Sequence, residues 1–264
     1  MVTVLSAAFP LHVVTDGDDR RPALLLLNPL GTTLSFWEPL IERLTEHNWV
    51  IRFDIRGHGR SVGEVAAYEI SDLADDAVSV LDALEVPRAH VFGASMGGLV
   101  AAELAAHHPN RVDRLVLAST GLQLGPDFWW HETIARAQVG GLSSVADHIE
   151  KVFFSDEWRA AFPEARRAAR EMFIATPVDA YVAGARAILN ADLRQAAPMI
   201  RAATLLIGGA DDPVLRHHPS SDLLDAIPDS EAVQVGGARH RVLLEQPALL
   251  TDVVCGFLTD PDGR

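Results

Sequence analysis

The stretch RAHVFGASMGGLVAAELAAHHP, residues 88–109, decides the fold of this protein. An apolar run typical of a buried β-strand ends at Ser95, and a run typical of a buried helix begins directly after it. Gly93 and Gly97 leave room for a tight strand-to-helix turn in which a side chain would clash. Such a turn exposes the serine hydroxyl and places the Met96 N–H at a helix N-terminus, where negative charge is stabilised.

The G-x-S-x-G pattern is weak by itself, because it arises by chance in roughly one in ten chains of this length. Serine and glycine are also ordinary turn residues. The strand before Ser95 and the helix after it favour a different interpretation, in which Ser95 is a nucleophile held on a sharp elbow. A serine nucleophile then needs an acid and a base, in the chain order Ser, Asp or Glu, His.

Candidates for both partners follow later strands. Asp211 and Asp212 come after the apolar run TLLIGG, and His240 lies in a glycine-rich loop after AVQV. Open α/β sheets build their sites at the carboxyl ends of strands, where these residues are expected. Singly, each aspartate is as well explained by a turn and His240 by a solvated loop. Together they predict a triad; the spacing from Gly209 favours Asp212 as the acid and leaves Asp211 as the alternative.

A second early loop is the candidate for the other half of an oxyanion hole. The apolar run LLLL is followed by Asn28-Pro29-Leu30-Gly31 and then by a helix start. Because proline has no N–H, the Leu30 amide is the expected donor beside that of Met96.

Short apolar runs alternate with amphipathic helical patterns along most of the chain. This rhythm predicts an α/β fold with a mostly parallel central sheet flanked by helices. We expect strands near residues 10–15, 23–27, 48–53, 89–92, 113–118, 203–207 and 231–235. We expect helices near residues 34–46, 71–85, 96–108, 218–226 and 244–257.

The rhythm changes between residues 123 and 200, where four helix-like segments follow one another without a strand. A run of helices inserted into an alternating pattern suggests a helical cap over the carboxyl edge of the sheet. We therefore expect a core domain of residues 1–122 and 201–264, with a cap (lid) insertion of residues 123–200.

Composition restricts the classes of partner. The chain has 264 residues and a formal net charge of −14, which argues against general binding to nucleic acid or an anionic membrane. One cysteine, Cys255, permits no intrachain disulfide and is expected to be a packing residue. The N-terminus lacks a signal-peptide pattern, and no apolar run approaches the ~20 residues of a membrane helix. We expect a cytoplasmic protein that acts on a small molecule.

With these residues in hand, the chain resembles the α/β-hydrolase superfamily and, within it, the 3-oxoadipate enol-lactonases. The resemblance is carried by NPLGTTLSFWEP (28–39), FDIRGHGRS (53–61), RAHVFGASMGG (88–98) and ADLRQAAPMIRAATLLIGGADDP (191–213). It implies an α/β-hydrolase fold and an enol-lactone hydrolase of aromatic catabolism that uses neither metal nor cofactor. Carried over by position, it implies the triad Ser95, Asp212 and His240, with Leu30 and Met96 as oxyanion donors.

The substrate of that family carries a carboxylate, which predicts a cation in the pocket. Arg136 and Arg216 are the candidates, although each is as well explained as a surface arginine. Trp129 and Trp130, with Phe128, either line the pocket or pack the cap on the core.

Other functions share the same triad. A carboxylesterase, a perhydrolase or a C–C bond hydrolase on this scaffold differs from an enol-lactonase in its cap residues. A non-catalytic ligand-binding protein on the same fold is the alternative from a different class. The sequence leaves the oligomeric state open.

Overall fold

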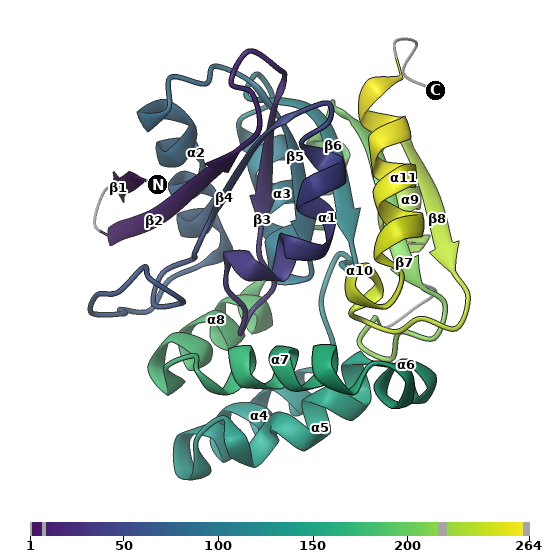
Figure 1. The fold of residues 1–264 in the computed structure, drawn as a ribbon. Helices are drawn as coiled ribbons and strands as arrows, with labels where there is room; N and C mark the ends of the chain where they lie inside the picture. The colour runs from purple at the N-terminus through teal and green to yellow at the C-terminus, as the bar shows by residue number, and fades with distance from the viewer. Residues whose placement is uncertain (1, 7–8, 216–220, 261–264) are drawn as a thin grey trace.

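An eight-stranded sheet runs through the protein, with helices packed on both of its faces (Figure 1). The computed structural model describes residues 2–6, 9–215 and 221–260. The strand order is β1-β2-β4-β3-β5-β6-β7-β8. The strands are β1 Val2–Ser6, β2 Phe9–Asp16, β3 Ala23–Leu27, β4 Trp49–Phe53, β5 Ala89–Ala94, β6 Val112–Ala118, β7 Ala203–Gly209 and β8 Ser230–Val235.

From β4 to β8 all neighbouring strands are parallel, and β1 and β2 form an antiparallel edge. The central strands are buried on both faces, so their side chains alternate between two cores. On β3, Leu25 and Leu27 join one apolar cluster, whereas Leu24 and Leu26 join the other. This double burial explains the continuous apolar runs in the sequence.

Helices cover both faces of the sheet. The helices α2 Ile70–Ala83 and α3 Met96–His107 pack into the cluster that contains Leu25. The 3₁₀ turn η1 Leu34–Trp37 and the helices α1 Glu38–Leu44, α10 Val242–Glu245 and α11 Pro247–Thr259 pack into the other. Cys255 is a buried member of this second cluster, as expected for a packing residue.

Five helices lie between β6 and β7 in the chain and gather at one end of the sheet (Figure 1). They are α4 Asp127–Gly140, α5 Ser143–Phe153, α6 Asp156–Ala161, α7 Pro163–Ile174 and α8 Val178–Asn190. The 3₁₀ turn η2 Ala197–Met199 leads from them into β7. We call α4–α8 the cap helices. No single described helix is long and apolar enough to cross a membrane; α7 and α8 meet that test only as a pair bent by 93°.

Some local expectations were wrong. Strand β1 was not expected, and its pairing with β2 from Val2↔Val13 onward extends the sheet by one edge strand. The expected helix 244–257 is interrupted at Gln246, because Pro247 cannot donate the N–H that continues a helix. The expected helix 218–226 appears as α9 Ser221–Ala226, and its first residues lie outside the described part of the chain.

Candidate active site

Ser95 occupies a sharp turn between β5 and α3. Its backbone has φ 54° and ψ −118°, a conformation that L-residues rarely adopt. A Cβ on Gly93 would lie 2.1 Å from the Gly97 carbonyl oxygen, and one on Gly97 would lie 2.0 Å from the Leu27 carbonyl oxygen. The expectation that both positions exclude a side chain is confirmed. Backbone strain of this kind persists only where its surroundings enforce it, and it clusters at functional sites.

The structure brings Ser95, His240 and Asp212 into one hydrogen-bonded chain. The Ser95 Oγ lies 2.9 Å from His240 Nε2, and His240 Nδ1 lies 2.8 Å from Asp212 Oδ2. All three residues are buried. With Nδ1 protonated and donating to the carboxylate, Nε2 is left to accept the serine proton. The arrangement has the geometry of a nucleophile, a base and an orienting acid.

The two neighbouring aspartates have different surroundings. Asp212 directs Oδ2 at His240, while its Oδ1 accepts a hydrogen bond of 2.8 Å from the Val214 N–H. Asp211 is exposed, and its backbone N–H donates to the Ala238 carbonyl. Of the two aspartates, only Asp212 is therefore in contact with His240.

Two backbone N–H groups near Ser95 have no acceptor within the described residues. Met96 is the first residue of α3, so its N–H has no partner in the helix. The Leu30 N–H has none either, and Leu30 lines the same pocket as Ser95. The next amide, of Gly31, donates to Nε2 of buried His58 at 3.3 Å. Burial lowers the pKa of His58 to about 4, which keeps this nitrogen neutral and able to accept.

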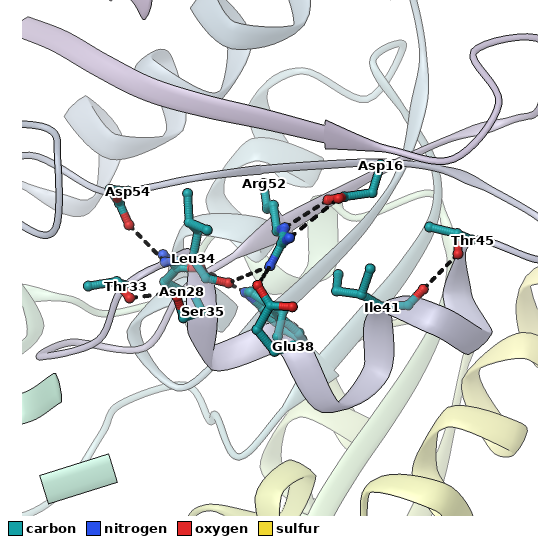
Figure 2. A network of polar contacts seen from close by, with 11 residues as sticks. Asp16, Asn28, Thr33, Leu34, Ser35, Glu38, Ile41, Thr45, Arg52 and Asp54 are labelled. Atoms are coloured by element: carbon teal, nitrogen blue, oxygen red, sulfur yellow. Dashed lines mark hydrogen bonds and ion pairs between the residues drawn. The ribbon is translucent and has the colours of Figure 1, made fainter. Parts of the chain in front are cut away.

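The 3₁₀ turn that follows the Leu30 loop is held by polar contacts from Arg52 of β4 and from Asp54, directly after that strand (Figure 2). The Asp54 carboxylate accepts from the Leu34 N–H at 2.7 Å, and Arg52 donates to the Leu34 carbonyl at 3.2 Å. Arg52 is itself paired with Asp16 and Glu38. These contacts fix the position of the chain just before α1.

Two adjoining hollows lie between the cap helices and the rest of the protein. A small pocket contains Ser95 and is lined by Leu30, Ser95, Trp130, Ile149, Phe153, Phe173, Tyr181 and Arg241. A larger cavity of about 230 Å³ extends between α1, α5 and α7. The two share Ile149, Phe153, Phe173 and Arg241, so these four residues lie at their junction. The walls are mainly apolar, as is usual for small-molecule sites.

The expected substrate-binding residues separate into three groups. Trp130 is buried, lines the pocket of Ser95 and donates to the Leu124 carbonyl. Trp129 packs beside it and donates to His148, while Phe128 is 70% exposed. Arg136 is exposed, bonds the Ser144 carbonyl and lines neither hollow, so the structure does not bring it to Ser95. Arg216 lies outside the described residues.

Three residues at the site were missed by the sequence reasoning. Phe153 packs on the His240 ring, Tyr181 points its hydroxyl into buried space, and Arg241 follows His240 directly. The position of Arg241 beside the candidate base is a signal that the sequence contained. Phe153 and Tyr181 carry no such signal, because cap aromatics are usually core residues. Within the described residues, no cluster of three or more His, Cys, Asp or Glu side chains could hold a metal ion.

One buried carboxylate joins the cap helices to the histidine loop. Glu245 of α10 accepts from both the backbone N–H and the hydroxyl of Ser155, the N-cap of α6. Its other oxygen accepts from the Arg239 N–H at 2.8 Å. One side chain thereby holds both Ser155, in the α5–α6 junction, and Arg239, directly before His240.

Comparison with known proteins shows the family of this chain. Residues 22–247 match the family defined by the alpha/beta hydrolase fold, and the chain belongs to that family. Within the family, it is 31% identical to 3-oxoadipate enol-lactonase 2 of Acinetobacter baylyi, over 96% of this chain and 94% of that protein.

Solved structures of hydrolases, an enol-lactonase among them, are similar to this chain along nearly its whole length. The enol-lactonase from Burkholderia xenovorans LB400 has 32% identity and a TM-score of 0.95, covering 98% of this chain and 100% of that one. A hydrolase from Pseudomonas aeruginosa PA01 has 34% identity and a TM-score of 0.92, covering 97% of both chains. This chain is thus an α/β hydrolase that is similar to enol-lactonases.

Proposed function

We propose that the protein is a serine hydrolase that opens an enol-lactone of the 3-oxoadipate type. The observation that carries the proposal is the buried chain of hydrogen bonds from Ser95 through His240 to Asp212. The similarity to enol-lactonases along nearly the whole chain supports the substrate class. The family resemblance adds a role in aromatic-compound catabolism to the same proposal.

The proposed reaction begins with attack of the Ser95 oxygen on the lactone carbonyl. His240 takes the serine proton, and Asp212 stabilises the imidazolium that forms. The Leu30 and Met96 N–H groups stabilise the negative charge on the tetrahedral oxygen, which is the step where preorganised donors contribute most.

Collapse of the intermediate breaks the ring C–O bond and leaves an acyl-enzyme. The leaving oxygen belongs to an enol, which is a better leaving group than an alkoxide, and it takes the proton that His240 received from Ser95, so His240 becomes neutral again. A water molecule then gives up a proton to His240 and attacks the acyl carbon; when the acid is released, His240 returns that proton to the Ser95 oxygen. No step needs a metal or a cofactor.

Ultraviolet absorbance of 3-oxoadipate enol-lactone tests the proposal, with p-nitrophenyl acetate as a parallel substrate. Rapid loss of lactone that disappears in Ser95→Ala supports an enol-lactonase. Ester cleavage without lactone turnover keeps the serine hydrolase and rejects the substrate, in favour of a carboxylesterase or a relative. Absence of both activities, together with no labelling of Ser95 by a fluorophosphonate probe, rejects the hydrolase in favour of a ligand-binding protein.

A further inference from the structure

Arg241 places a charge at the junction of the two hollows. It is the N-cap residue of α10, and its backbone N–H donates to the Phe153 carbonyl at 2.9 Å. The guanidinium carbon lies 5.4 Å from the ring centroid of Phe36 and 5.1 Å from that of Phe153. The residue is only 6% exposed, and it lines both the pocket of Ser95 and the larger cavity.

This buried guanidinium makes no ion pair with any residue that the structure describes. Within residues 2–6, 9–215 and 221–260, no carboxylate oxygen lies within 4.0 Å of it. Its Nη2 makes one long contact of 3.4 Å with the Leu30 carbonyl, and its Nη1 is buried without any hydrogen bond. Buried charges in proteins are normally paired, because an unpaired one loses its hydration without compensation.

Arg52 shows how this chain pairs a buried arginine. It is 5% exposed and contacts both Asp16, at 2.8 Å, and Glu38, at 2.7 Å (Figure 2). Burial lowers the pKa of Arg241 to about 10, so the group remains charged at neutral pH. Arg241 therefore differs from Arg52 in having no carboxylate in contact with it among the described residues, and the charge of Asp212 acts on it only from beyond contact distance.

The other arginines of the larger cavity are already neutralised. Arg166 bonds Glu150, and Arg170 contacts Asp147 at 2.6 Å. Beside Arg241, the Tyr181 hydroxyl is buried without a partner in the same pocket as Ser95. The pocket is thus lined by two residues with an unsatisfied buried donor, Nη1 of Arg241 and the hydroxyl of Tyr181, within mainly apolar walls.

We propose that Arg241 binds a carboxylate of the substrate while the carbonyl that reacts lies at Ser95, with the Tyr181 hydroxyl as a second donor. The inference rests on the proposed serine hydrolase and assigns the residue that selects, among small esters and lactones, those that carry a separate carboxylate. Arginine suits this task because its planar fork can donate two charge-assisted hydrogen bonds to one carboxylate. Binding at this distant group orients the carbonyl for attack.

Two esters that differ in one carboxylate test the assignment. We would compare p-nitrophenyl acetate with mono-p-nitrophenyl glutarate for the wild type, Arg241→Gln and Arg241→Lys. Loss of the guanidinium is expected to raise KM for the anionic ester about 10- to 100-fold more than for the neutral ester. Arg241→Lys should recover part of this difference. Arg136→Gln is the control, because it removes the same charge from the exposed side of α4. It should leave the ratio of the KM values for the two esters as in the wild type.

An equal rise in KM for both esters in Arg241→Gln would overturn the proposal, since it would mean that Arg241 only positions the Leu30 loop. Binding of glutarate, measured by calorimetry in a Ser95→Ala background, separates this inference from the proposed hydrolase. Glutarate binding that disappears with Arg241→Gln supports the anion site even if neither ester is hydrolysed. Hydrolysis of both esters without discrimination, and without glutarate binding, leaves the hydrolase and rejects the anion site.

Discussion

The Phe153 ring packs against the imidazole of His240, with 4.7 Å between the ring centroids. Phe153 ends α5, whereas His240 belongs to the loop after β8, so the contact joins a cap helix to the sheet. The same ring faces Arg241. One aromatic side chain therefore packs against the candidate base and forms part of the pocket wall.

Truncation of Phe153 should destabilise the protein and impair the site together. Phe153→Ala is expected to lower the free energy of unfolding by about 3–5 kcal/mol, the usual cost of removing a buried phenylalanine. Phe128→Ala is the matched control on the cap, because Phe128 is 70% exposed and its loss should cost within about 0.5 kcal/mol. Urea denaturation measures both. A similar small change for the two variants would contradict the contact described here.

The two aspartates should respond differently to the same change. Asp212→Asn is expected to reduce turnover by about 10⁴-fold, because the amide no longer stabilises the imidazolium or selects its tautomer. Asp211→Asn should change turnover by less than about 3-fold, since an exposed substitution away from the hydrogen-bonded chain has little effect. Steady-state kinetics of both variants decide the assignment. A large loss with Asp211→Asn alone would transfer the role of acid to Asp211.

Glycine-to-alanine substitutions at two positions should change the stability of the protein in opposite directions. A Cβ on Gly97 would collide with backbone atoms of β3, which cannot move aside, so Gly97→Ala should abolish activity and lower the melting temperature. A Cβ on Gly256, within α11, meets nothing within 4 Å. Gly256→Ala should therefore stabilise the protein by up to about 1 kcal/mol, through better helix propensity. Calorimetric melting of both variants checks the pair; stabilisation by Gly97→Ala would refute the packing at the elbow.

Stability should depend on pH through His58. Burial lowers its pKa from 6.5 to about 4 in the folded protein. Between these values the unfolded chain binds more protons, so the contribution of neutral His58 is complete above pH 6.5 and decreases as the pH falls toward 4. Between pH 7.5 and pH 5 the loss should amount to about 2 kcal/mol.

His58→Gln should remove that part of the pH dependence, because an amide oxygen can still accept from Gly31 but does not titrate. His107→Gln, at an exposed position on α3, serves as the control and should keep the wild-type slope. Urea denaturation at the two pH values gives the comparison. If the free energy of unfolding changed equally with pH in the wild type and in His58→Gln, the pKa of His58 would not differ between the folded and the unfolded state.

Much of the fold was predictable from local patterns. The glycines around Ser95 and the alternation of apolar runs with amphipathic segments predicted the elbow and seven of the strands, because these features depend on neighbours in the chain. The short edge strand β1 was missed, since its stability comes from pairing with β2 and not from its own five residues. The order Ser95, Asp212, His240 suggested a site, but the choice between Asp211 and Asp212 rested only on spacing.

The sequence by itself determined where strands turn into helices and which positions exclude a side chain, because both follow from the size and polarity of adjacent residues. Only the tertiary structure decided which charges are paired. Arg52 and Arg241 look alike in the sequence, yet one lies between two carboxylates and the other between the rings of Phe36 and Phe153. The physical reason is that a buried charge is balanced by groups that are distant in the chain and meet only when the sheet and the cap helices come together.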